Sequence, residues 1–247
     1  MSKSISGRSR KRFAAALGQP AKTDNSSVAL SAKVAIRENV MAAIAQDCAT
    51  PGPAVFDAFA GEGVLFRQVW HRAVSYVGCD LKWYRDERLM FVADNHRVMR
   101  AIDLSAFNVF DIDSWGSPWD QVLILAARRP LAAGERLGLV LTEGSSLKLR
   151  MGALPHSLVT LSSIRPRLDG AARGHDDIIN RALAGMCRRM QCRIVKRWQA
   201  RTRTGSAMRY IGLVLEGTAQ KGQRIFEAGG ESPEPRRITG LMTTPCG

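Results

Sequence analysis

Residues 55–64 read Val-Phe-Asp-Ala-Phe-Ala-Gly-Glu-Gly-Val, and they indicate the fold more clearly than any other segment. An apolar run ends at Asp57, a turn of small residues containing Gly61 and Gly63 follows, and a helical pattern begins directly after the turn. A strand, a glycine turn and a helix in this order build a site for a nucleotide-sized ligand at the carboxyl end of the strand.

The rest of the chain alternates between short apolar runs and helical patterns. We predict strands at residues 54–59, 75–79, 91–93, 107–112 and 137–141, and helices at residues 28–46, 63–72 and 117–128. This alternation predicts an α/β fold with a Rossmann-like, mostly parallel sheet flanked by helices. A helix at 176–190 followed by strands at 193–199 and 208–216 predicts an antiparallel hairpin at the C-terminal edge of the sheet.

The length of 247 residues fits one large domain with extensions. We expect a folded domain at residues 28–217, between a basic disordered tail at 1–27 and a disordered tail at 218–247 that is rich in Gly, Pro and Thr. No apolar run approaches the ~20 residues of a membrane span, and no apolar segment follows the basic amino terminus. We therefore expect a soluble, cytoplasmic protein.

The five cysteines and four histidines show no metal-ligand spacing. The cysteine count is odd, and no pair has the Cys-x-x-Cys spacing. We expect free thiols in a reducing compartment and no metal site.

The formal net charge of +14 favours a polyanionic partner, such as nucleic acid or an acidic membrane surface. Most of the excess lies between Lys148 and Arg209, where fourteen basic residues stand against three acidic ones. Arginine dominates this segment and suits bidentate phosphate contact and stacking. A solvated basic face is the alternative. The candidates for nucleic-acid contact are Arg188, Arg189, Lys196, Arg197, Arg201 and Arg203.

Two further acids follow the next predicted strands. Asp80 is placed to accept hydrogen bonds from a ribose diol, and Asp94, followed by Asn95, could accept from an adenine amine. Taken singly, a Gly-x-Gly is often only a turn and such an Asp is often a helix cap. Their order at three successive strand ends favours a shared cofactor.

The glycine turn is not that of a dinucleotide site. A dinucleotide fingerprint needs a third glycine where Phe66 stands, and Glu62 would repel phosphates. No P-loop lysine is present, so NAD and nucleoside triphosphates are disfavoured.

The segment Asp57-Ala-Phe-Ala-Gly61-Glu-Gly63 resembles the first motif of class I S-adenosylmethionine-dependent methyltransferases. It is similar to the Asp-x-Phe-Ala-Gly-x-Gly form common in enzymes that methylate nucleic-acid amines. The resemblance covers roughly residues 54–217 and includes the closing helix and hairpin. It implies S-adenosylmethionine as cofactor, with Asp57, Gly61 and Gly63 around the methionine part, Phe59 in the same binding motif, Asp80 on the ribose and Asp94 near adenine.

Residues 111–118, Asp-Ile-Asp-Ser-Trp-Gly-Ser-Pro, follow the fourth predicted strand. An amine nucleophile must have its lone pair aimed at the methyl carbon. The carboxylate of Asp113 and the carbonyl of Ser114 could hold the two amine hydrogens, and Trp115 could stack on a base. Asp111 is a weaker candidate. The alternative is a Gly-Pro turn with an exposed Asp cap and a core Trp.

This loop resembles the Asp-Pro-Phe-Gly-Ser-Pro motif of tRNA guanine dimethyltransferases and, more loosely, the Asp-Pro-Pro-Tyr motif of amino-methylating DNA enzymes. Ser114 stands where both have proline. We predict an S-adenosylmethionine-dependent methyltransferase that modifies an exocyclic base amine in DNA or RNA, alone or with a partner subunit for target recognition. The alternatives are a catalytically inactive, methyltransferase-like nucleic-acid-binding protein and a small-molecule methyltransferase.

Overall fold

The computed structural model describes residues 27–47, 51–82, 85–145, 153–164, 174–201 and 208–219. The strands are β1 (Ala54–Asp57), β2 (Ser75–Asp80), β3 (Met90–Val92), β4 (Val109–Ile112), β5 (Arg136–Glu143), β6 (Cys192–Arg201) and β7 (Arg209–Gly217). The helices are α2 (Ser27–Ala45), α3 (Val64–Gln68), α4 (Asn95–Ala101), α5 (Trp119–Arg128), α7 (His156–Ser162) and α8 (His175–Met190).

The seven strands of the described residues form one sheet in the order β3-β2-β1-β4-β5-β7-β6. The pairs from β3 to β5 are parallel, whereas β7 runs antiparallel to both β5 and β6. The predicted mostly parallel sheet with an antiparallel C-terminal hairpin is confirmed. The central strand β4 is buried at all four residues, which is why its sequence is a short apolar run rather than an alternating pattern.

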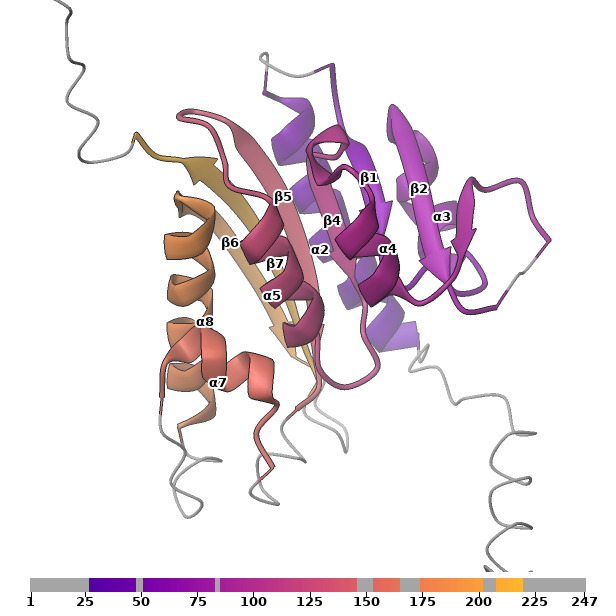
Figure 1. The fold of residues 1–247 in the computed structure, drawn as a ribbon. Coiled ribbons are helices and arrows are strands. Elements are labelled where there is room, and N and C mark those ends of the chain that lie inside the picture. The colour runs from indigo at the N-terminus through magenta and orange to yellow at the C-terminus, as the bar shows by residue number, and fades with distance from the viewer. Residues whose placement is uncertain are drawn as a thin grey trace, which may run out of the picture.

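Helices cover both faces of the sheet (Figure 1). Helices α4, α5, α7 and α8 lie over one face, where side chains such as Phe110, Leu139 and Met186 form the larger core. Helix α2 lies on the opposite face and packs Ile36, Val40 and neighbouring apolar residues against β5 and β7. Helix α2 lies close to the sheet, because a Cβ atom on Gly212 of β7 would stand only 2.8 Å from Ile36 Cγ2.

Several element boundaries differ from the predicted ones. The predicted helix at 63–72 divides at Val69, whose φ and ψ of −130° and −60° separate α3 from a short 3₁₀ turn at Trp70–Arg72. The predicted strand at 107–112 begins at Val109, after a second 3₁₀ turn at Leu104–Ala106. Helices α4 and α7 were not predicted. Residues 1–26 and 220–247, which carry most of the two predicted tails, lie outside the described residues.

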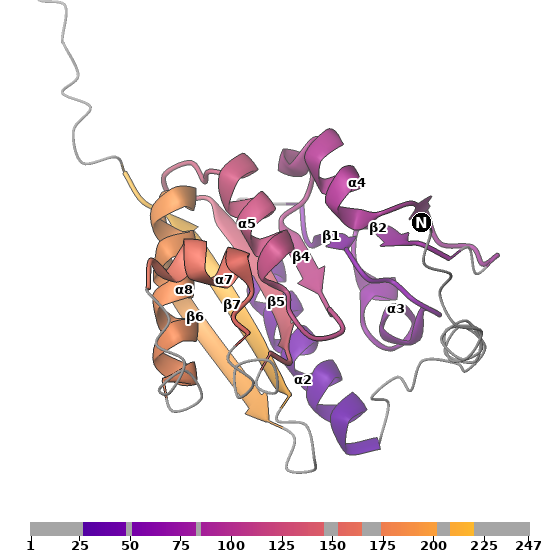
Figure 2. The same ribbon diagram turned by 60° about the horizontal axis from the view of Figure 1, so that its bottom comes forward.

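The parallel strands β1, β2, β4 and β5 all end at one edge of the sheet, which Figure 2 brings toward the viewer. We call it the carboxyl edge. Strand β6 also ends there, because Arg201 pairs with Arg209, which in turn pairs with Glu143 of β5. No helix in the described part of the chain is long and apolar enough to cross a membrane.

Candidate functional site

The glycine turn after β1 lies at the carboxyl edge. Gly61 and Gly63 both have left-handed backbones, with φ of 46° and 75°, a conformation that glycine adopts without strain. The turn closes through the N–H of Gly63, which donates to Ala60 O at 3.1 Å, and the N–H of Ala60 donates to Cys79 O at 3.0 Å. These bonds fix the turn against the end of β2.

Asp80, the last residue of β2, contacts this turn directly. Its Oδ2 accepts from the N–H of Gly61 at 3.0 Å, and its Oδ1 accepts from the N–H of Lys82 at 2.9 Å. An ionised carboxylate can accept about four hydrogen bonds. The half-buried Asp80 therefore retains capacity for hydroxyl donors while it is held in place by two backbone amides.

Asp94 caps helix α4. Its Oδ1 accepts from the N–H groups of His96 at 2.8 Å and Arg97 at 3.2 Å, which lowers the pKa of this exposed carboxyl. Asn95 is engaged on both sides, since it donates to Ala58 O at 2.8 Å and accepts from Gln121 at 3.0 Å. Asp94 is therefore a helix cap, as the alternative stated. Both of these backbone hydrogen bonds end on its Oδ1.

Asp57 is buried at the end of β1. It accepts hydrogen bonds from the N–H of Phe59 at 3.1 Å and from Tyr76 Oη at 3.0 Å. Burial, reinforced by the nearby charge of Asp111, raises the pKa of Asp57 to about 8. Phe59 itself is half-buried and packs against the larger core.

Arg88, in the segment that connects β2 to β3, was not predicted as part of the site. Its guanidinium donates to Ala60 O at 2.8 Å and Gly61 O at 2.7 Å, and it pairs with Asp86 at 2.6 Å. A Cβ atom on Gly63 would lie 2.9 Å from Arg88 Cζ. Arg88 thus braces the glycine turn from the side of β2, and nothing in its local sequence distinguishes it from the other arginines of the chain.

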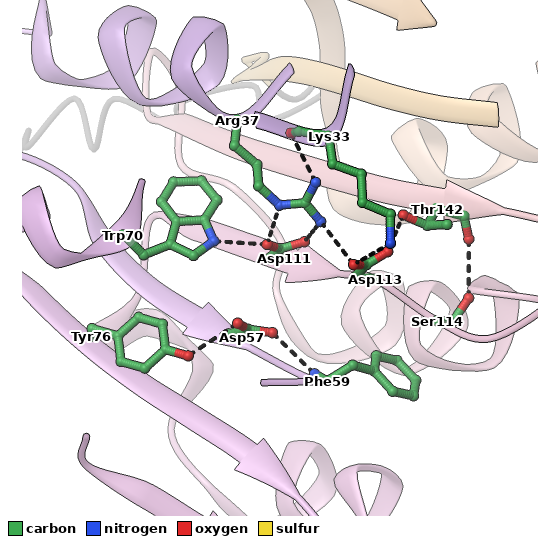
Figure 3. Close-up of polar contacts among 10 residues, drawn as sticks. All are labelled: Lys33, Arg37, Asp57, Phe59, Trp70, Tyr76, Asp111, Asp113, Ser114 and Thr142. Carbon is green, nitrogen blue, oxygen red and sulfur yellow. Dashed lines mark hydrogen bonds and ion pairs between the residues drawn. The ribbon is translucent and has the colours of Figure 1, made fainter. Parts of the chain in front are cut away.

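Asp111 belongs to a sealed ion pair rather than to a ligand site (Figure 3). Arg37 of α2 binds it through two bonds of 2.6 and 2.7 Å, and Trp70 Nε1 donates to it at 2.7 Å. The side chains of Asp111 and Arg37 are both 0% exposed. The weaker catalytic candidate is therefore enclosed by the fold.

Asp113 lies just beyond the end of β4 and carries a different set of contacts. Lys33 Nζ stands 3.0 Å from its Oδ2, Arg37 Nη2 stands 3.6 Å from the same oxygen, and Thr142 Oγ1 donates to its Oδ1. Burial acts to raise the pKa of Asp113, but the charges of Arg37 and Lys33 outweigh it and hold the pKa below its usual range. Asp113 is therefore an ionised acceptor at neutral pH.

The loop after Asp113 turns at Ser114 and Gly116. The Ser114 side chain is buried, and its hydroxyl donates to Thr142 O at 3.0 Å. The N–H of Gly144 donates to Gly116 O at 2.6 Å, and Gly116 has a φ of 105°. Where the resembling motifs have proline, this chain fixes its loop by hydrogen bonds to the end of β5 and to the residue that follows it.

Trp115 is 77% exposed, whereas the side chain of Asp113 is 11% exposed. The alternative of an exposed Asp cap with a core Trp is therefore wrong, since the burial of the two residues is reversed. The core tryptophan of this region is Trp119, at the start of α5.

Lys33 and Arg37 are the main site residues that the sequence analysis missed. They stand four positions apart on α2, so they share one face of the helix. Asp111 and Asp113 stand two positions apart at the end of β4, so they also share one side. These two spacings were the available signal. Nothing in the local sequence indicates that Arg37 pairs with Asp111, 74 positions away, or Lys33 with Asp113, 80 positions away.

The predicted nucleic-acid-binding residues are spread along α8 and β6 rather than gathered at the carboxyl edge. Arg201 ends β6 at that edge and binds Asp176 at 2.9 Å, while Arg188 and Arg189 end α8 near the opposite edge. Strand β6 has ten residues, which at about 3.4 Å each separates its ends by roughly 30 Å. Lys196 and Arg197 are exposed between them, and Arg203 lies outside the described residues.

No family model matches the chain, and no curated protein matches it either. Solved structures do. The chain is similar to Trm1 from Pyrococcus horikoshii in complex with S-adenosyl-L-methionine, with 13% identity, a TM-score of 0.48, and coverage of 75% of this chain and 55% of that one. It is similar to an rRNA methylase from Streptococcus thermophilus, with 10% identity, a TM-score of 0.43 and coverage of 76% and 97%.

A third similar structure is the magnesium protoporphyrin IX methyltransferase of Synechocystis with bound S-adenosylhomocysteine, with 14% identity, a TM-score of 0.47 and coverage of 86% and 95%. Identities this low assign no substrate. The strand order of the chain itself, with its antiparallel last hairpin, shows a Rossmann-like, mostly parallel sheet.

Proposed function

We propose that the protein is an S-adenosylmethionine-dependent methyltransferase that modifies an exocyclic amine of a base in DNA or RNA. One observation supports this most directly. An ionised carboxylate, Asp113, stands at the end of the strand next to the glycine turn, and an exposed tryptophan, Trp115, follows it two residues later. An acceptor for amine hydrogens and a stacking surface for a base are the two parts that such a reaction requires.

The residues around the glycine turn fit the cofactor. Asp80 has acceptor capacity left for a ribose diol, and Asp57 offers a carboxyl group to a cationic ammonium. Gly61 and Gly63 bring backbone close to the ligand without side chains. When bound, S-adenosylmethionine supplies a methyl group carried on a positively charged sulfur.

The residues of the loop orient the amine rather than deprotonate it beforehand. Asp113 accepts one amine hydrogen, the carbonyl of Ser114 accepts the other, and Trp115 holds the plane of the base. The nitrogen releases one proton when it gains the methyl group. The proton passes by way of the Asp113 carboxylate to water, because Arg37 and Lys33 keep the pKa of Asp113 too low for it to hold the proton.

The same cations disfavour an aliphatic amine substrate, which is an ammonium ion at neutral pH. Lys33 Nζ at 3.0 Å and Arg37 Nη2 at 3.6 Å from Asp113 Oδ2 would repel it. An amine conjugated to an aromatic ring is neutral and suits this site. The basic residues of α8 and β6 favour a substrate that carries phosphates.

A catalytically inactive nucleic-acid-binding protein is the second candidate. The Lys33–Asp113 ion pair favours it, because it uses part of the acceptor capacity of the carboxylate. The first proposal requires that the remaining capacity be sufficient for an amine.

Methyl transfer from tritiated S-adenosylmethionine to separate pools of unmodified DNA and total RNA tests the proposal. We expect label in one pool with the unchanged protein and with Asp120→Asn, whose side chain is 60% exposed. We expect none with Asp113→Asn. Nucleic-acid binding without label in either pool, with or without bound cofactor, would support the second candidate instead.

A further inference from the structure

The two ion pairs between α2 and β4 form an inner and an outer layer (Figure 3). The inner pair, Arg37 and Asp111, is 0% exposed on both sides, so no ligand reaches it. The outer pair, Lys33 and Asp113, is 11% exposed on both sides, next to the loop that carries Trp115. Lys33 therefore reaches the surface at the same place as the proposed catalytic carboxylate.

Lys33 retains hydrogen-bond donors at this place. Its ammonium has three N–H groups, and within the described residues it makes one hydrogen bond, to Asp113 Oδ2 at 3.0 Å. The Tyr210 ring centroid lies 5.7 Å from Lys33 Nζ, which places the ammonium in a cation–π contact. A donor and an acceptor thus stand side by side, each with capacity left.

The bases differ in whether their hydrogen-bonding edges can bind this donor and acceptor together. In adenine and cytosine, the exocyclic amine is next to a ring nitrogen that accepts a hydrogen bond on the Watson–Crick edge. In guanine, the ring nitrogen at the corresponding place carries a hydrogen and is a donor, which would face a second donor on Lys33. Enzymes that act on extruded or single-stranded bases read this edge.

We propose that Lys33 donates to the ring nitrogen beside the target amine while Asp113 accepts from the amine itself, so that the substrate base is adenine or cytosine. This inference rests on the proposed function and narrows it. Lys33 then determines which base is methylated. Helix α2 takes part in base recognition, although it lies outside the sequence motifs.

Base analogues test this without altering the protein. The quantity measured is kcat/KM for methyl transfer to single-stranded oligonucleotides that differ at one target base. In the first set the target is adenine, 1-deazaadenine or 7-deazaadenine. In the second set it is cytosine, 3-deazacytosine or guanine. Removing the acceptor next to the amine, in 1-deazaadenine or 3-deazacytosine, should lower kcat/KM about tenfold to a hundredfold, the range expected for a hydrogen bond to a charged group. The 7-deazaadenine control should lose far less.

A protein variant supplies the second arm. In Lys33→Met, kcat/KM for the natural base should fall and the ratio between the natural base and its deaza analogue should approach one. Equal rates for the natural base and its analogue in the unchanged protein, or label on guanine alone, would overturn this inference and leave methyl transfer in place. No label on any natural base would overturn the proposed function and this inference together.

Discussion

Tyr76 Oη donates a hydrogen bond of 3.0 Å to Asp57 Oδ2, and this bond joins the side chains of the first two strands at the base of the glycine turn. Burial and the neighbouring carboxyl of Asp57 raise the pKa of Tyr76, so its hydroxyl keeps its proton. Burial and, after it, the charge of Asp111 raise the pKa of Asp57 itself to about 8.

The stability of the protein should therefore depend on pH through Asp57. Its pKa is about 8 in the folded chain, against about 3.9 in an unfolded one. Between these values the folded state binds a proton that the unfolded state does not. This contribution to the free energy of unfolding is complete below about pH 4 and is lost as the pH rises through about 8.

Urea unfolding between pH 5.5 and 8 measures this. The difference in the free energy of unfolding between the unchanged protein and Asp57→Asn should change steadily across that range, with the unchanged protein losing stability toward pH 8. Parallel curves for the two proteins would assign the pH dependence to other groups.

Cofactor binding should release a proton from the same carboxyl group. If the ammonium of S-adenosylmethionine lies against Asp57, as proposed, the ionised form of Asp57 binds it better. The affinity should then rise from pH 6 to pH 8. Calorimetry in two buffers of different ionisation enthalpy should show a difference in apparent binding enthalpy, and Asp57→Asn should lack it.

Asp111 and Asp113 should respond differently to substitution. Asp111→Ala leaves the fully buried Arg37 without its bidentate partner, and breaking a buried pair in this way costs about 3–5 kcal/mol. Asp113→Ala should cost less, because the ammonium of Lys33 reaches the surface and can be hydrated. Urea unfolding of both variants compares the two costs.

The loss of activity should not follow the loss of stability. Asp113→Ala should remain folded, bind S-adenosylmethionine and transfer no methyl group. A variant of Asp113 that retains transfer would remove this residue from the proposed mechanism.

The strand ends were the part of the site that the sequence predicted best. Asp57, Gly61 and Asp80 meet because parallel strands bring their carboxyl ends to one edge, and this follows from the order of short apolar runs. Asp94 is a less clear case. An acidic residue after a strand can contact a ligand or cap a helix. Because Asp94 was interpreted mainly as a ligand contact, helix α4 was not predicted.

The charges around Asp113 could not be predicted in the same way. Lys33 and Arg37 read as ordinary solvated charges of an amphipathic helix, because the apolar positions around them already account for helix packing. Only the docking of α2 on the sheet shows that these cations face β4. Burial of Asp113 and exposure of Trp115 depend on the same long-range arrangement.

Trp115 should contribute to substrate binding and hardly at all to stability. The side chain is 77% exposed, and such surface substitutions usually change stability by no more than about 0.5 kcal/mol. Loss of base stacking by Trp115→Ala should weaken nucleic-acid binding by about 1–3 kcal/mol, whereas Trp115→Phe should retain much of it. Fluorescence anisotropy with a labelled oligonucleotide, beside urea unfolding, measures both quantities.

The exposed cations of α8 and β6 should set the salt dependence of nucleic-acid binding. Lys196 and Arg188 are exposed and make no ion pair within the described part of the chain, so each is available to a phosphate. Replacing one of them by alanine should reduce the slope of log affinity against log salt by about 1.

Arg136 is the matched control, because its guanidinium is already bound to Glu216. Arg136→Ala should leave the slope unchanged. Equal effects of Arg136→Ala and Lys196→Ala would indicate general attraction to a basic protein rather than a defined path along β6.

The distance in sequence between the cations of α2 and the acids of β4 also orders events during folding. Three carboxyl groups, Asp57, Asp111 and Asp113, come together as soon as β1 and β4 pair, and the cations that neutralise two of them arrive only when α2 docks. Until then the strands hold mutually repelling charges. Helix α2 precedes β4 in the chain, so its cations can complete these ion pairs only after residues 74 and 80 positions further along have been synthesised.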